Sequence, residues 1–584
     1  MNEKEIHFYH PLLKYEKPAT YVWVTLGGLL LFSGIFVDFS WLNDLGYKHL
    51  HYYLPIYLRY VSFIKPLFIM TGGFLFFAFI LKTPILKFYQ EEMFKPEVLL
   101  VVFILLIFIA LVFIAYVPFK NYPYSMDEYN FLYQAKIFAN GKLFLKVPET
   151  YRPFVEQYMI LRDGKLFSKY PPGFPLILSI GVLLKYPGLI NPLISVATLF
   201  ILFGFVKSLL GPKYGLVSVI LMSTTPYFLA YSASYYTHPT ALMLTTLLFF
   251  GVRKYEITKK DLYLPVIGFV AGYSFLTRPL DSFCAVVPAY AYLAYVMYKE
   301  KSLKKIIYPI STFAILFSVF VAYNHLLTKK VSIAAYPVLR GEFQIVDIYK
   351  KNILSNIASV ISNYMSNGIE NLPILLIKYL FVPCVFFIPL FAIFGAFKFI
   401  SKWKWLLISN YVMLILLYNF HPGLGWPTYG ARYYYSGFVS LVVLATVASK
   451  QLIEMLKNNK LVYHIFAVIL CVQLIFSASS IWAYSYRFKI WTDVRKDLVN
   501  TCPVGSIVIL NNPTALKPSN SIPLRIADFV DLVDAQRNPF MDPSRLIAIK
   551  DKHLKIPRLN LSEIKAHFPN HSICYYNFNI LRNK

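Results

Sequence analysis

Two adjacent carboxylates, Asp127 and Glu128, follow a long apolar segment and are flanked by tyrosines at positions 122, 124 and 129. A carboxylate just outside a membrane helix can accept a proton from, or orient, a substrate held at the membrane surface. A plainer interpretation is helix capping, since acidic residues are favoured at helix starts. The pair alone leaves both interpretations open.

Five further residues stand near the ends of apolar segments and could bind an anionic group: Lys169, Tyr170, His238, Arg278 and Arg432. A guanidinium fork suits a pair of phosphate oxygens. Each cation could instead extend from the membrane interface to lipid headgroups, and the histidine could be an ordinary interfacial polar residue. Ionisable residues gathered at one membrane face indicate a functional site.

The composition excludes an ordinary soluble protein. The 584 residues are 57% hydrophobic and 15% charged, with a mean hydropathy of +0.54, whereas soluble domains are about half apolar. With about 20 apolar residues needed for each span, we expect about thirteen transmembrane helices. They fall near 20–37, 61–81, 97–118, 188–209, 213–231, 238–255, 262–279, 281–298, 306–324, 373–397, 404–420, 434–451 and 461–483. No cleaved signal peptide is evident, so the first span is expected to be retained.

Lysines and arginines alternate from loop to loop, which places the N-terminus inside. The 119–187 loop, the 325–372 loop and the tail from 484 then lie outside a plasma or inner membrane. Most of the net charge of +28 reflects this topology. The rest favours contact with anionic headgroups or saccharides, and no basic-aromatic module indicates a nucleic-acid partner.

The sequence divides into four regions: three N-terminal spans (1–118), an outer loop (119–187), a helical membrane core (188–483) and a tail (484–584). The outer loop is too long and too patterned to be a simple connection. Within it, Asp127–Asn140 reads as an amphipathic helix that Gly141 ends, and Pro175–Lys185 as a short interfacial helix.

The tail has the pattern of a small α/β domain, with strands at 506–510 and 573–576. Cys502 and Cys574 either pair in an oxidising exterior or remain thiols. The predicted fold class is therefore an all-α polytopic membrane protein with interfacial helices in a long outer loop and an outer α/β domain.

No phosphate-binding glycine loop or dinucleotide motif occurs in the sequence. The energy for a reaction must then arrive with the substrate, as it would with an activated lipid-phosphate donor. No cofactor is indicated with certainty, although the acidic pair could hold a divalent metal.

Over roughly 100–450 the chain resembles the polytopic glycosyltransferases that use polyprenyl-phosphate sugars (the GT-C superfamily, family 39-like). This group includes the protein O-mannosyltransferases and the aminoarabinose transferases of lipid A. Three spans precede the motif loop here, two more than the single span that precedes it in the family, and the tail is divergent. The matching motifs are the pair 127–128, the helix 129–141, the Lys-Tyr-Pro-Pro-Gly run 169–173, the Thr-Arg-Pro run 277–279 and the Gly-Ala-Arg-Tyr-Tyr run 430–434.

The resemblance implies transfer of a sugar from a polyprenyl-phosphate donor to a lipid, glycan or protein acceptor, with inversion at C1. Asp127 would act as general base or orient the acceptor, and Glu128 would hold the loop or a second hydroxyl. Lys169, Arg278 and Arg432 would stabilise charge on the leaving phosphate. A phosphate acceptor would need no base, and Asp127 would then position the sugar or its amine.

Three other functions remain open from the sequence. A transporter or flippase would place its ionisable groups near the bilayer midplane in repeated, broken helices, and no repeat is found. A glycan polymerase or ligase would use outer-loop arginine and histidine without an acidic pair. A structural or receptor-like membrane protein is the third.

Overall fold

The computed structural model describes residues 95–123, 125–148, 155, 158–329, 387–419 and 432–455, together with short pieces between 466 and 577. Two units divide the chain, Met1–Lys95 with Leu452–Ala483, and Pro96–Gln451 with Tyr484–Lys584. The features below belong to the second unit. The spans expected at 20–37 and 61–81, the larger part of the span expected at 373–397 and nearly all of the 325–372 loop lie outside the described residues.

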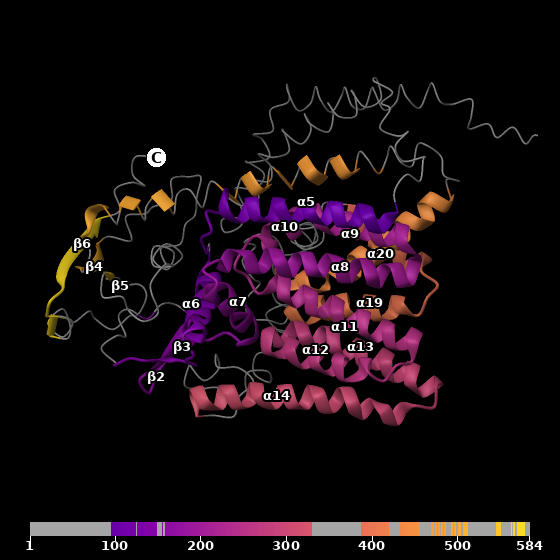
Figure 1. Ribbon diagram of the computed structural model, residues 1–584, viewed down its shortest axis with the longest axis horizontal. Coiled ribbons are helices and arrows are strands. Elements are labelled where there is room, and N and C mark those ends of the chain that lie inside the picture. Colours follow the sequence, from indigo (N-terminus) through magenta and orange to yellow (C-terminus); the bar gives the residue numbers. More distant parts are fainter. Residues whose placement is uncertain are drawn as a thin grey trace, which may run out of the picture. The chain divides into compact units, whose positions relative to one another are not determined.

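The described chain is mostly helical, and its long helices lie side by side (Figure 1). Five are long and apolar enough to cross a membrane: α5 (Pro96–Tyr116), η4 with α8 (Pro187–Leu189, Ile190–Leu210), α13 (Pro279–Lys299), η5 with α14 (Leu303–Ile306, Ile307–Thr328) and η7 with α20 (Arg432–Gly437, Phe438–Met455). Between them lie α11 (His238–Thr258), α12 (Tyr263–Thr277), α18 (Phe387–Lys398) and α19 (Trp403–Asn419). Several spans in the membrane are therefore supported, and the total of about thirteen stays a prediction.

The span expected at 213–231 is broken. It forms α9 (Pro212–Ser223) and α10 (Pro226–Ser232), bent by 71°. Pro226 cannot donate the hydrogen bond that would continue α9. The Thr225 hydroxyl instead caps α10 by accepting the Phe228 N–H at 3.1 Å. If the pair counts as one span, the described residues contain six candidates.

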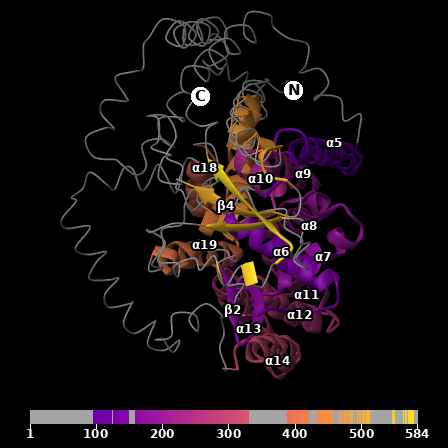
Figure 2. The same ribbon diagram turned by 90° about the vertical axis from the view of Figure 1, so that its left-hand side faces the viewer.

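The 119–187 loop contains the two expected helices, α6 (Met126–Ala139) and α7 (Gly173–Leu183). It also contains an antiparallel sheet that the sequence analysis did not predict, with β3 (Lys165–Ser168) between β1 (Leu145–Lys146) and β2 (Met159–Arg162). Figure 2 looks onto the end of the helix stack where α6, α7 and β2 lie. The hairpin turn is Asp163-Gly164, both with positive φ, a dipeptide that favours such turns.

The sheet packs against the end of α14. Ile160 and Phe167 of the hairpin form one buried cluster with Tyr323 and Leu327. The Lys165 ammonium donates to the Leu326 carbonyl at 2.8 Å. Because β3 runs directly into the Lys-Tyr-Pro-Pro-Gly run, this packing fixes where that run begins.

The contact between α7 and α12 needs a residue without a side chain. A Cβ on Gly173 would lie 2.7 Å from the Leu276 carbonyl oxygen and 2.6 Å from the Thr277 hydroxyl. The Tyr273 hydroxyl donates to the Gly173 carbonyl at 2.8 Å. Glycine thus brings the start of α7 against the end of α12, next to Arg278.

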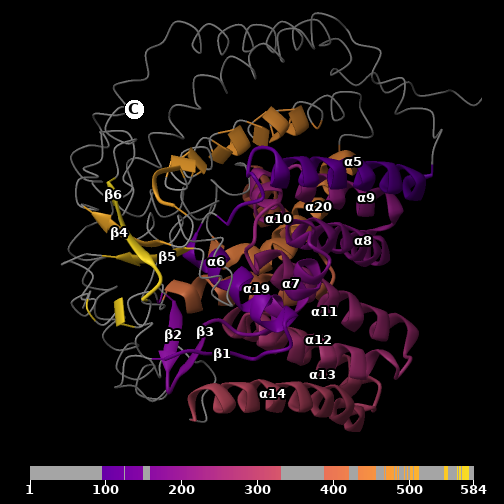
Figure 3. The ribbon, with the colours of Figure 1, turned by 60° about the vertical axis from the view of Figure 1, so that its left-hand side comes forward.

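The tail contains a parallel sheet in the order β5-β4-β6, from β4 (Ser506–Asn511), β5 (Arg545–Ile549) and β6 (Ser572–Asn577). Figure 3 shows the three strands together. The strands expected at 506–510 and 573–576 are confirmed, and β5 was not predicted. Cys502 and Cys574 form a disulfide with a Cα–Cα distance of 5.8 Å, which confirms the first of the two alternatives for these cysteines.

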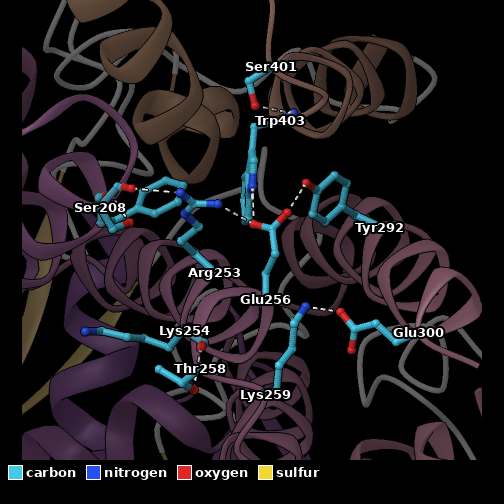
Figure 4. A network of polar contacts seen from close by, with 11 residues as sticks. Ser208, Arg253, Lys254, Glu256, Thr258, Lys259, Tyr292, Glu300, Ser401 and Trp403 are labelled. Atoms are coloured by element: carbon cyan, nitrogen blue, oxygen red, sulfur yellow. Dashed lines mark hydrogen bonds and ion pairs between the residues drawn. The ribbon is translucent and has the colours of Figure 1, made fainter. Parts of the chain in front are cut away.

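A network of polar contacts joins four helices (Figure 4). Glu256 of α11 accepts hydrogen bonds from Arg253 (2.6 Å), from Tyr292 of α13 (2.7 Å) and from the Trp403 indole of α19 (2.8 Å). Arg253 also donates to the Ser208 carbonyl of α8 at 2.8 Å. A single carboxylate therefore connects helices far apart in sequence.

We expect Glu256→Ala to lower the unfolding temperature in detergent by several degrees. Three donors would lose a shared acceptor, at a cost of about 2 kcal/mol. Glu300→Ala, which removes the more exposed Lys259–Glu300 pair of the same figure, should cost under about 1 kcal/mol. Equal unfolding temperatures for the two variants would contradict a central role for Glu256.

We expect Gly173→Ala to destabilise the protein by about 1–3 kcal/mol, because its methyl group would collide with main-chain atoms of α12. Gly251→Ala is the matched control, since its nearest neighbour would be a side-chain atom of Ile267 at 3.1 Å. Thermal unfolding of both variants in detergent measures the difference. A Gly173→Ala protein as stable as the control would show that the close approach is not required.

Candidate active site

The Asp127 carboxylate is the meeting point of three distant segments. It lies in the first turn of α6, which Ser125 caps. Its Oδ2 pairs with the Arg432 guanidinium at 2.5 Å, and its Oδ1 accepts from the Tyr170 hydroxyl. Both charged side chains are 16% exposed. The structure thus brings together the acidic pair, the Lys-Tyr-Pro-Pro-Gly run and the start of η7.

Glu128 is fully buried and faces a different set of partners. Its Oε2 accepts a hydrogen bond from the Tyr235 backbone N–H at 3.0 Å. The backbone N–H of Glu128 donates to the Ser125 hydroxyl at 3.3 Å. Glu128 therefore attaches α6 to the segment that precedes α11. This contact is of the kind expected for a residue that holds the loop, and its role in a reaction stays a prediction.

Lys169 lies beside the ion pair. Its ammonium is 3.2 Å from the centre of the Tyr158 ring and 4.9 Å from that of Tyr170, a cation–π arrangement. Burial lowers the pKa of Lys169 to about 8; nearby Asp127 opposes this shift and Arg432 adds to it. The lysine is therefore a cation whose charge changes close to neutral pH.

Arg278 forms a separate ion pair with Asp281. Its Nε lies 3.0 Å from Asp281, and its Nη2 donates to the Tyr418 hydroxyl at 3.0 Å, which in turn donates to Asp281. Tyr418 stacks on Tyr433 with ring centres 4.4 Å apart, and the guanidinium of Arg432 is 5.2 Å from the Tyr433 ring centre. Two stacked tyrosines thus bridge the two arginines.

His238 is buried among tyrosines rather than placed at the surface. Its ring centre lies 4.9 Å from that of Tyr231, 5.1 Å from that of Tyr236 and 6.2 Å from that of Tyr435. Neither ring nitrogen has a hydrogen-bond partner among the described residues. Arg278 and Arg432 are the charged groups that act on it electrostatically, so all the residues expected at the site lie in one neighbourhood.

The arrangement of the acidic pair does not suit a divalent metal. Asp127 is engaged by Arg432 and Tyr170, whereas Glu128 is directed to a backbone amide. Within the described residues, no group of three or more histidine, cysteine, aspartate or glutamate side chains could hold an ion. The two carboxylates serve separate elements instead of forming one ligand set.

The sequence analysis missed Asp281 and Tyr418. An acidic residue in the first turn of an apolar helix, three positions after Arg278, is a signal that could have identified Asp281. Tyr418 ends an apolar helix and is one of 47 tyrosines in the chain. Its partners lie 137 and 140 positions away, so no local pattern marks it.

Helices of membrane-spanning length and a charged site at one end of them define a multi-pass membrane enzyme. Residues 169–323 match the family model described as dolichyl-phosphate-mannose-protein mannosyltransferase. The chain is accordingly a glycosyltransferase that depends on a lipid-phosphate sugar, which confirms the resemblance drawn from its motifs. The matched segment contains Lys169, His238 and Arg278, and it excludes Asp127 and Arg432.

Solved structures of low similarity include ArnT from Cupriavidus metallidurans bound to undecaprenyl phosphate, with a TM-score of 0.47, 8% identity, and coverage of 82% of this chain and 89% of that chain. The Archaeoglobus fulgidus oligosaccharyltransferase in complex with Zn and sulfate gives a TM-score of 0.40, 11% identity, and coverage of 74% and 61%. We draw no conclusion from either. No curated protein matches the chain.

The position of Lys169 predicts a pH dependence. A lysine is cationic below its pKa, so a phosphate interaction that needs this charge should weaken as the pH rises through about 8. We expect kcat/KM for the lipid-phosphate donor to fall above that pH. Lys169→Arg should keep its charge and remove this fall. A profile that is the same in both proteins would contradict a charge requirement at this position.

Proposed function

We propose that the protein transfers a sugar from a polyprenyl-phosphate donor to an envelope acceptor at the outer face of the membrane, by a single inverting displacement. The observation that carries the proposal is the Asp127–Arg432 pair, with Tyr170 on the second carboxylate oxygen and Lys169 alongside. A carboxylate that can accept the acceptor's proton and cations that can bind the phosphate thus lie in one buried cluster.

In the proposed reaction, an acceptor oxygen forms a bond to the sugar C1 while the bond from C1 to the phosphate oxygen breaks. The electron pair leaves with the polyprenyl phosphate, and the acceptor proton passes to Asp127. Lys169, Arg432 and Arg278 stabilise the charge that builds on the phosphate. A phosphate acceptor would bring no such proton, and Asp127 would then orient the sugar.

The side of the membrane is also part of the proposal. The alternation of lysines places the 119–187 loop and the tail outside. The Cys502–Cys574 disulfide supports this for the tail, since disulfides persist in oxidising compartments. The acceptor would accordingly be a lipid, glycan or protein of the cell envelope.

We expect Asp127→Asn to reduce sugar transfer by about 100-fold or more, in line with the loss of a positioned base. Transfer from a polyprenyl-phosphate sugar to envelope extract is measured in detergent, with folding checked by thermal unfolding. Asp163→Asn, an exposed hairpin acid from the same loop, is the control and should retain full transfer.

Undiminished transfer by the Asp127→Asn protein would contradict the assignment of this carboxylate. Movement of labelled donor across vesicles by that variant, without any transfer by the wild type, would favour a flippase instead.

A further inference from the structure

Buried hydroxyls and one imidazole gather where α8, α10, α11 and η7 meet. The junction is defined by Asn191 of α8, whose amide donates to the Ser234 and Tyr236 carbonyls, and by Tyr231 of α10, whose ring centre is 4.8 Å from that of Tyr435 in η7. Within the part of the chain that the structure describes, six side chains here are buried and have no hydrogen-bond partner: Ser195, Ser232, Thr237, His238, Thr240 and Ser436. We call these six residues the hydroxyl cluster.

Buried polar atoms are nearly always hydrogen-bonded, so a group of exceptions in one place needs an explanation. A serine or threonine in a helix can often turn to a carbonyl of its own helix, as Thr446 does toward Val442 at 2.8 Å. The imidazole of His238 is the strongest exception, since both of its nitrogens lack partners and only 2% of the residue is exposed.

The chemistry of the hydroxyl cluster suits a sugar ring. Hydroxyls and a neutral imidazole can both donate to and accept from sugar hydroxyls, and the surrounding rings of Tyr231, Tyr236 and Tyr435 offer flat apolar faces. Small-molecule sites combine apolar lining with a few convergent polar groups in this way.

Charge narrows the class of sugar. The guanidiniums of Arg278 and Arg432 act on His238 electrostatically, and the carboxylates of Asp127 and Glu128 act in the same way on the adjacent Tyr236. The carboxylates of Asp127, Glu128 and Asp281 already have partners, so none of them is free to compensate an ammonium group. The same arginines place the hydroxyl cluster beside the cations assigned to the phosphate.

We infer that the hydroxyl cluster binds the sugar of the lipid-phosphate donor and selects a neutral polyhydroxylated sugar over an amino sugar. This inference rests on the proposed function, because it assumes that the donor phosphate lies at Lys169, Arg278 and Arg432. It assigns His238 to the sugar rather than to the phosphate.

The test measures binding of three probes to the full-length protein in nanodiscs: polyprenyl phosphate alone, the same lipid bearing a neutral hexose, and the same lipid bearing an amino sugar. We expect the wild type to bind the neutral donor at least about 10-fold more tightly than the amino donor. Thr240→Val and His238→Gln should each weaken binding of the neutral donor about 10-fold, and leave binding of the sugar-free lipid within about 2-fold.

Thr446→Val is the matched control, since it also removes a fully buried helix hydroxyl, and it should bind all three probes as the wild type does. Ser436→Ala provides a second variant in case His238→Gln fails to fold. Equal binding of the neutral donor by the wild type and the folded cluster variants, or a preference for the amino donor, would overturn the inference. Failure of the wild type to bind any probe would instead count against the proposed function.

Discussion

The ion pair between Asp127 and Arg432 is the interaction on which the arrangement of this site depends. It joins side chains 305 positions apart and is largely buried, where a charge without its partner is very unfavourable. Tyr170 occupies the other carboxylate oxygen, and Tyr433 lies near the guanidinium. The start of α6, the start of α7 and η7 are therefore held in one geometry by a requirement that each charge be compensated.

The second arginine repeats this design with a different acid. Arg278 is oriented by Asp281 and Tyr418, and Arg432 is oriented by Asp127, whose other carboxylate oxygen accepts from Tyr170. Each guanidinium is thus aligned before any phosphate arrives, so little reorganisation would be needed when charge develops. The cost is competition, because an incoming phosphate must share each arginine with a carboxylate already present.

Local patterns in the sequence were sufficient for some of this structure. The spacing of apolar residues before Gly141 predicted α6, and the same kind of pattern predicted α7 and most of the long helices. The Asp163-Gly164 dipeptide is a local signal for the hairpin, and Pro226 is one for the break in the 213–231 span. Neither feature was predicted. The pairing of Arg278 with Tyr418 could not be read locally, because it arises only when α13 and α19 pack together.

The close contact at Gly173 has a consequence for how the site can vary. Main-chain atoms of α7 and α12 meet there without an intervening side chain, and Lys169 and Arg278 stand just before and just after the two contacting segments. With glycine at position 173, the two backbones that lead to these cations approach each other as closely as main-chain packing allows. The backbone around the proposed phosphate-binding residues would therefore have little freedom to move. Differences in sugar or acceptor would have to be accommodated by side chains farther away.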